Sequence, residues 1–219
     1  MSQEIIHVYL MPGMAASPKI FEYIKLPEKQ FKIHYLEWII PLVNESFEDY
    51  ALRMTQYIKH ENIVLLGVSF GGVLVQEIAK IIAVKKIILV SSIKSHHEFP
   101  NRLKLLQKTK AYKFFPTKII ENFDKYKKYF LGDFLKKRAD LYTLYLSVND
   151  ALYLKWAIYT ILHWQQDKIP ENILHIHGNN DHVFPSKHIH NFTEINNGSH
   201  VMILLKANEI STIICKNLT

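Results

Sequence analysis

Residues 62–79 read Asn-Ile-Val-Leu-Leu-Gly-Val-Ser-Phe-Gly-Gly-Val-Leu-Val-Gln-Glu-Ile-Ala. The apolar run Ile63–Leu66 predicts a strand, and a pattern typical of a helix begins at Gly72. Between them stands Gly67-Val68-Ser69-Phe70-Gly71, a G-x-S-x-G motif in the strand–turn–helix setting of a nucleophile elbow. Such a turn is too tight for side chains at its flanks, which explains the glycines. It also leaves the hydroxyl of Ser69 exposed above the strand ends.

The composition indicates one globular domain with an insertion. The chain has 219 residues, of which 48% are hydrophobic, enough to bury a substantial core. Its longest apolar runs are far shorter than the ~18 residues of a membrane span. Its N-terminus lacks the basic region of a secretory signal. The single cysteine, Cys215, excludes an intrachain disulfide and is typical of a reducing compartment, so we expect a cytoplasmic protein.

The net charge of +7 comes from the middle of the chain. Residues 94–155 contain 14 Lys and Arg but only 6 Asp and Glu. A lysine-rich, solvated helical surface explains such a segment. The functional alternative is attraction of an anionic substrate, a cofactor tail or a membrane surface. No nucleic-acid reader motif accompanies the charge, so we expect no nucleic-acid partner.

Strand and helix patterns alternate along the chain, which predicts an α/β fold. Patterns typical of strands occupy residues 4–11, 31–37, 63–66, 86–91, 172–177 and 190–195. Patterns typical of helices occupy residues 17–26, 46–58, 72–82 and 201–217, with Ser46 as an N-cap. We therefore expect a mainly parallel sheet of about six strands with helices on both faces.

The alternation stops between the fourth and fifth strands. This part of the chain has no convincing strand pattern, and its helical patterns cover residues 101–113, 117–129, 134–147 and 150–165. We expect residues 1–93 and 168–219 to form the core and residues 94–167 to form an all-helical insertion. The insertion contains the basic excess and many aromatic side chains, which we expect to pack between its helices and to line an apolar pocket.

Two later segments supply partners for the serine. A serine hydroxyl needs a general base to take its proton, and the base needs an orienting carboxylate. Such groups gather beyond the carboxyl ends of parallel strands. Asp181 stands four residues past the strand that ends at His177, and His200 follows the next strand. The order Ser69, Asp181, His200 matches the nucleophile, acid and base order that accompanies such an elbow.

The negative charge that forms on an attacked carbonyl oxygen needs two donors. One is expected to be the backbone N–H of Phe70, the residue after the nucleophile. The other should come from the loop after the first strand, Pro12-Gly13-Met14. Gly13 would let this backbone turn inward, and we predict the N–H of Met14 as the second donor.

These segments together resemble the α/β-hydrolase superfamily, over nearly the whole chain. The matching motifs are Leu10-Met11-Pro12-Gly13-Met14, Gly67-Val68-Ser69-Phe70-Gly71-Gly72, His177-Gly178-Asn179-Asn180-Asp181 and Gly198-Ser199-His200. The resemblance implies a cap domain over the site and an acyl-serine intermediate in the hydrolysis of a carboxylic ester or thioester, with no metal or organic cofactor. Pro12 replaces the family's usual histidine, and the two N-terminal strands of larger members are missing.

Other functions remain open at this stage. The same fold supports acyl transfer, C–C bond cleavage and cofactor-free peroxide chemistry. A non-catalytic binding protein that uses the basic cap is a further alternative. The lysine excess favours an anionic small-molecule substrate, while substrate identity and oligomeric state have no sequence signal.

Histidines are common in this chain, which has 12 of them. His175-x-His177 followed by Asp181-His182 is similar to the H-x-H-x-D-H motif of metallo-β-lactamase-like hydrolases, but its spacing is two residues too long. Two histidines at i and i+2 on a strand share a face and can bind zinc. We expect partly buried structural histidines here, and no metal.

Overall fold

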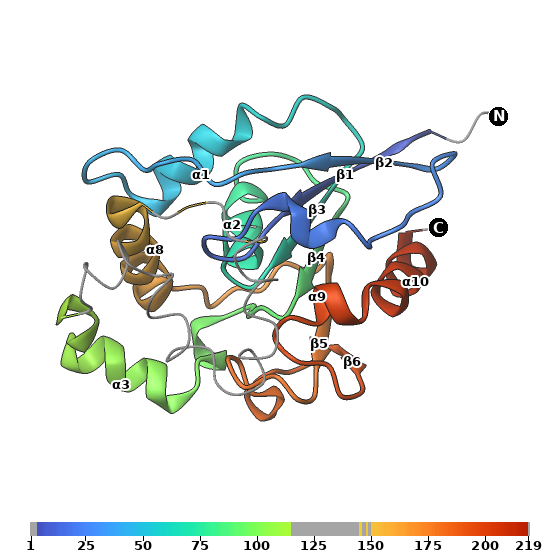
Figure 1. Cartoon of the computed structure of the whole chain (residues 1–219). Helices are drawn as coiled ribbons and strands as arrows, with labels where there is room; N and C mark the ends of the chain where they lie inside the picture. Colours follow the sequence, from blue (N-terminus) through green and yellow to red (C-terminus); the bar gives the residue numbers. More distant parts are fainter. Residues whose placement is uncertain (1–3, 115–144, 146–147, 149, 219) are drawn as a thin grey trace.

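The computed structural model describes residues 4–114, 145, 148 and 150–218, and in this part of the chain six strands form one parallel sheet (Figure 1). The strand order is β2-β1-β3-β4-β5-β6, and every neighbouring pair is parallel. The strands are β1 (Ile6–Met11), β2 (Phe31–Tyr35), β3 (Ile63–Val68), β4 (Lys86–Val90), β5 (Ile173–Gly178) and β6 (Thr193–Ile195). The predicted α/β class and the parallel sheet are confirmed.

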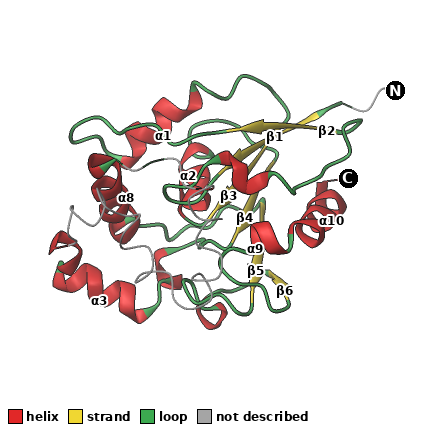
Figure 2. Cartoon of the chain, in the orientation of Figure 1, coloured by secondary structure: helices red, strands yellow, loops and turns green. Residues whose placement is uncertain are grey.

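Helices cover both faces of the sheet (Figures 1 and 2). The α-helices of the described residues are α1 (Phe47–Thr55), α2 (Phe70–Ile78), α3 (Asn101–Thr109), α8 (Ala151–His163), α9 (Met202–Leu205) and α10 (Ala207–Leu218). Short 3-10 segments are η1 (Pro18–Phe21), η2 (His96–Glu98), η3 (Ala111–Phe114) and η4 (Ser186–His188). None of these helices is long and apolar enough to cross a membrane.

Successive side chains of the strands point to opposite faces of the sheet and belong to two separate hydrophobic clusters. Tyr9 and Leu65 point to the cluster formed with α1, α2 and α8. Their neighbours Val8 and Leu66 point to the cluster formed with η1, α9 and α10. This alternation follows from the two-residue period of a strand, so a sheet with helices on both faces needs strands that are apolar throughout.

The helix start at Ser46 is as predicted. The Ser46 hydroxyl accepts the N–H of Asp49 at 3.0 Å and donates to the Asp49 carboxylate at 2.7 Å. This pair satisfies one of the N–H groups that a helix start leaves without an intrahelical acceptor.

Two predicted helices are shorter or interrupted. The helix expected over residues 17–26 is only the single turn η1, and the N–H of Lys25 donates to the Ser211 hydroxyl of α10 instead. The helix expected over residues 201–217 is divided at Lys206 into α9 and α10.

Two other predicted boundaries were wrong. The strand expected over residues 190–195 shrinks to β6, because the carbonyl groups of His190 and Asn191 accept hydrogen bonds from the ammonium of Lys94. Asn191 also has a φ of 47°, which no strand residue adopts. Helix α3 ends at Thr109, since Lys110 turns into the left-handed region.

The segment between β4 and β5 contains α3 and α8, and its described residues form no strand. The helices predicted over residues 117–129 and 134–147 lie outside the described residues, except for Tyr145. Helix α8 does not stand apart from the core, since its Tyr153 and Ala157 are fully buried in the α1–α2 cluster. This helix therefore ties the insertion to the sheet.

Two histidines of β5 are core residues. His175 is 3% exposed and His177 is fully buried, more deeply than the sequence predicted. Burial lowers the pKa of both rings below the ordinary 6.5, and like charge lowers it further, from His177 at His175 and from His200 at His177. Both imidazoles are therefore neutral in the folded protein near neutral pH.

These two rings make the fold sensitive to acid. The unfolded chain takes up their protons first as the pH falls through about 6.5, so the free energy of unfolding should fall below that pH and be fully present above it. Urea denaturation of wild type and His175→Leu at about pH 7.5 and about pH 5.5 measures this dependence. The variant should lose less stability between the two pH values than wild type. Equal losses would contradict the assignment, and His190→Ala, an exposed histidine, serves as the control.

Candidate active site

Ser69 stands in a strained turn between β3 and α2. Its φ of 52° and ψ of −121° lie outside the regions that residues other than glycine ordinarily adopt. The Ser69 N–H donates to the carbonyl of Val90 at 3.0 Å, and its carbonyl accepts the Ser92 hydroxyl at 2.7 Å. Because β4 holds the turn on both sides, the strain persists and the side chain stays partly exposed.

Close backbone approach explains the glycines around Ser69. A Cβ at Gly71 would lie 2.6 Å from the Met11 carbonyl oxygen and also clash with the carbonyl of Pro12. A Cβ at Gly67 would clash with Gly71, and one at Gly72 would lie 2.6 Å from Ser92 Cβ. The residues beside Ser69 must therefore lack side chains because there is no room for a Cβ. Backbone conformation is not the reason, since none of these glycines has a positive φ.

A second close approach joins the loop that carries Asp181 to the loop that carries His200. A Cβ at Gly178, the last residue of β5, would lie 2.7 Å from Gly198 Cα. The N–H of Asn180 donates to the Gly198 carbonyl at 3.0 Å. Because these loops touch, Asp181 and His200 are held side by side although the chain passes through η4 and β6 between them.

The three side chains predicted from sequence form one hydrogen-bonded row. The Nδ1 atom of His200 lies 2.8 Å from Asp181 Oδ2, and its Nε2 atom lies 3.0 Å from Ser69 Oγ. Asp181 is buried, while His200 and Ser69 are partly exposed. If Nδ1 carries the proton that Asp181 accepts, Nε2 presents its lone pair to the Ser69 hydroxyl.

The carboxyl of Asp181 is built to stay ionised. Burial is the largest influence and by itself would raise its pKa. The hydrogen bond and charge of His200, together with the backbone N–H of Phe184 and a smaller contribution of His177, outweigh it and lower the pKa. The N–H groups of Val183 and Phe184 also donate to Oδ1 at 2.7 and 2.9 Å. The buried ring of His177 donates from Nε2 to the Phe184 carbonyl at 2.8 Å and fixes the turn from behind.

Met14 is the predicted second donor to the oxyanion. Hydrogen bonds hold the residues on both sides of it in the loop after β1. The Trp38 indole N–H donates to the Gly13 carbonyl at 2.7 Å, and the Ala15 N–H donates to the Tyr153 hydroxyl at 3.0 Å. The Gly13 carbonyl and the Met14 N–H belong to one planar trans peptide and point in opposite directions. Anchoring the carbonyl on Trp38 therefore fixes the direction of the Met14 N–H.

This loop also lies against the nucleophile. A Cβ at Gly13 would meet Ser69 Cβ at 3.5 Å, which is ordinary contact distance. Gly13 has no positive φ, and the left-handed residue of the loop is Ala15, with a φ of 60°. The reason proposed for glycine at position 13, an inward turn of the backbone, is therefore not seen. The first N–H groups of α2 have no intrahelical acceptor, and this holds for Phe70, the other predicted donor.

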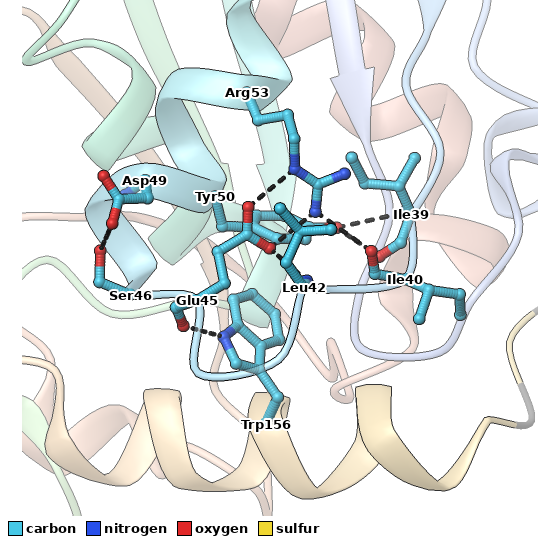
Figure 3. A network of polar contacts seen from close by, with 9 residues as sticks. All are labelled: Ile39, Ile40, Leu42, Glu45, Ser46, Asp49, Tyr50, Arg53 and Trp156. Carbon is cyan, nitrogen blue, oxygen red and sulfur yellow. Dashed lines mark hydrogen bonds and ion pairs between the residues drawn. The ribbon is translucent and has the colours of Figure 1, made fainter.

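The loop that carries Trp38 is itself fixed by a polar network, shown in Figure 3. The guanidinium of Arg53, on α1, makes two hydrogen bonds of 2.7 Å to the Glu45 carboxylate. The Glu45 carbonyl accepts the Trp156 indole N–H of α8 at 3.0 Å, and the Tyr50 hydroxyl donates to the Ile39 carbonyl at 3.0 Å. The network thus joins α1, α8 and the loop between β2 and α1.

Sequence reasoning missed the supporting residues Trp38, Tyr153 and Ser92. The Trp38 ring stacks on Phe70 with centroids 5.0 Å apart, so it holds both donor segments at once. These residues lie far from the elbow and the acid in sequence and follow no motif. The one available signal was the position of Trp38 soon after a strand, at the edge of the sheet where catalytic groups gather.

The elbow glycines allow a test of the packing. Gly71→Ala should lower the free energy of unfolding by about 1–3 kcal/mol, because its Cβ has no room against Met11 and Pro12. Gly13→Ala is the matched control and should change it by less than about 0.5 kcal/mol, since its Cβ meets ordinary contacts only. Chemical denaturation measures both values, and equal losses would contradict the close approach at Gly71.

Comparison with known proteins supports the fold. No protein-family model matches the sequence, and a search of curated proteins finds no match. Among solved structures, a bromoperoxidase from Bacillus anthracis has a TM-score of 0.65 at 16% identity, covering 99% of this chain and 92% of that chain. A carboxylesterase structure from Nitrososphaera gargenis has a TM-score of 0.62 at 18% identity, covering 98% and 90%.

The RedJ thioesterase from the prodiginine pathway of Streptomyces coelicolor has a TM-score of 0.60 at 10% identity, covering 97% of this chain and 85% of that chain. These structures share the sheet and the helices around it over nearly their whole length. At such identities the likeness establishes architecture. The chain has the α/β-hydrolase fold.

Proposed function

We propose that this protein is a serine hydrolase that cleaves carboxylic esters or thioesters through an acyl-enzyme on Ser69. The observation that carries the proposal is the row from Ser69 through His200 to Asp181, with contacts of 3.0 and 2.8 Å. A serine, an imidazole and a buried carboxylate in this order are the parts that activate a hydroxyl. The location that we propose is the cytoplasm, in keeping with the single cysteine.

The reaction follows from these contacts. Ser69 Oγ attacks the substrate carbonyl carbon while His200 Nε2 takes the hydroxyl proton, and Asp181 stabilises the imidazolium that forms. The N–H groups of Phe70 and Met14 donate to the oxyanion. When the tetrahedral adduct collapses, the leaving alcohol or thiol takes the proton from His200. Water then attacks the acyl carbon while His200 takes one of its protons. The bond between the acyl carbon and Ser69 Oγ breaks, His200 returns the proton to Oγ, and the acid product leaves.

The substrate class is proposed from the basic segment. Helix α3 carries basic side chains, and its Arg102 guanidinium donates to the carbonyl groups of His182 and Val183, next to the acid Asp181. Positive charge thus lies beside the loop of the acid. We propose that residues 94–167 act as the cap over the site, and that this cap favours an ester or thioester with an anionic group.

A second candidate function is perhydrolysis. It is favoured by the bromoperoxidase among the structural neighbours, and it needs the same acyl-serine. Hydrogen peroxide in place of water would attack the acyl carbon and release a peracid. Comparing peracid and carboxylic acid products in the presence of hydrogen peroxide separates this reaction from hydrolysis.

The nucleophile is tested by a fluorophosphonate probe and short p-nitrophenyl esters. Wild type should be labelled at Ser69, and Ser69→Ala should lose labelling and at least about 10³-fold in kcat/KM. His200→Gln should lose a similar factor, since the hydroxyl then has no base. Ser186→Ala, on η4, serves as the matched control. Labelling that survives in Ser69→Ala would end the proposal.

Trp38 is proposed as a positioning residue for the oxyanion donors. Trp38→Phe keeps the ring stacked on Phe70 but removes the indole N–H that holds the Gly13 carbonyl. We expect kcat for p-nitrophenyl esters and the labelling rate to fall roughly 10-fold with KM little changed, less than for loss of a direct donor.

The matched control for this variant is Trp164→Phe, which removes an indole hydrogen bond of the same length to Glu77, elsewhere in the core. Trp164→Phe should lose at least as much stability as Trp38→Phe, because its hydrogen bond goes to a buried carboxylate, whereas the Gly13 carbonyl keeps the N–H of Ala16. Equal activity of the two variants would show that Trp38 has only a structural role.

A further inference from the structure

Three histidines gather on one face of the sheet, beside the first half of β1 and away from Ser69. His7 lies on β1 and His34 on β2, and because His34 pairs in register with Tyr9, the two histidines share a face of the sheet. His60 follows α1 in the turn before β3 and lies over the same face. His7 pairs with Ile63, six residues before Ser69, so the cluster lies roughly 20 Å from the nucleophile at the usual rise along a strand.

The ring nitrogens of this cluster converge. One ligating atom from each of the three rings lies within 4.8 Å of the others. His7 Nδ1 and His34 Nε2 are 2.8 Å apart, a distance at which they share one proton. The ring of His60 covers His7 at a centroid distance of 3.9 Å and His34 at 4.4 Å. The nitrogen that accepts the proton shared by His7 and His34 keeps a lone pair there. The His60 ring lies nearly parallel to the His7 ring, at an interplanar angle of 10°, so this exposed ring must turn to direct a lone pair at the same ion.

We propose that His7, His34 and His60 form a binding site for a divalent transition-metal ion of the zinc type. Three imidazoles with one open position are a donor set typical of Zn²⁺, and His60 is exposed enough for water to complete the coordination. The cation would replace the proton that His7 and His34 share. Zn–N bonds of about 2.0–2.1 Å require that the two nitrogens separate by about half an ångström, which small side-chain rotations supply.

The surroundings of His60 fit the proposal. Its Nδ1 atom lies 2.6 Å from the Tyr9 hydroxyl, whose oxygen accepts the Lys59 N–H at 2.9 Å. Metal-binding histidines commonly donate the proton of their second nitrogen to such a partner, which fixes the tautomer and the ring. When Nδ1 carries the proton and donates it to the Tyr9 hydroxyl, the Nε2 atom of His60 keeps its lone pair for the metal.

The positive charge of Lys32, next to the cluster, weakens the binding of a cation. Lys32 pairs with His7 and lies on the same face. Burial and then the charge of His60 lower the pKa of both His7 and His34, and the charge of Lys32 adds to this. A bound cation meets the same repulsion. The proposal therefore makes a specific claim, that removing the charge of Lys32 strengthens metal binding, whereas histidines that only pack together would show no such response.

Isothermal titration of tag-free, chelator-treated protein with ZnCl₂ is the test, and it does not depend on the proposed function. Wild type should bind one Zn²⁺ per chain and gain thermal stability, because the metal joins β1, the edge strand β2 and the turn before β3. His60→Ala, at an exposed position, and His34→Ala should weaken binding at least 10-fold. Lys32→Gln should tighten it. MgCl₂ should not bind, because Mg²⁺ prefers oxygen ligands.

The matched control is His97→Ala. Among the described residues, the other group with converging metal-ligand atoms is His96, His97 and Asp167, which is mostly exposed. This variant should bind Zn²⁺ like wild type. Loss of binding in His97→Ala but not in His60→Ala would place the metal there and overturn the proposal. An absence of saturable binding, or equal binding by His60→Ala and wild type, would also overturn it. Circular dichroism of each variant verifies that it is folded.

Discussion

The close approach of two backbone segments at the carboxyl end of the sheet governs this structure. Gly71, at the start of α2, lies against the carbonyl groups of Met11 and Pro12 with no room for a Cβ. This contact sets α2 close to the loop after β1, and Gly13 of that loop lies against the Cβ of Ser69. The loops of a parallel sheet that carry functional groups gather at this end. Because Gly71 has no side chain, its backbone can contact the loop after β1 directly.

Around this contact, side chains from distant parts of the chain hold the backbone of the loop after β1 and the first residue of α2. Trp38 holds the Gly13 carbonyl and stacks on Phe70, while Tyr153 of α8 holds Ala15. Helix α8 comes from the inserted segment, so the loop beside the nucleophile depends on residues from both the core and the insertion. A site that stabilises a developing charge needs such rigid donors, because reorganising them during the reaction would cost free energy.

Two regions of the sheet differ in chemistry. The carboxyl end holds the serine, the imidazole and the carboxylate in one row, whereas the face over the first half of β1 holds the three imidazoles of His7, His34 and His60. Histidine serves both regions because one ring nitrogen can be fixed by a hydrogen bond while the other presents its lone pair. At His200 the fixing partner is Asp181, and at His60 it is Tyr9.

Local patterns in the sequence predicted the order of strands and helices, the elbow at Ser69, and Asp181 and His200 as its partners, because these features rest on short periods and on residues that follow strand ends. The helix expected at residues 17–26 and the strand expected at residues 190–195 were shortened by hydrogen bonds from Lys25 to Ser211 and from Lys94 to His190. Strand pairing and helix packing alone decided that Trp38 meets Gly13 and that His7 meets His34 and His60. Such contacts join residues far apart in the chain, and no local pattern records them.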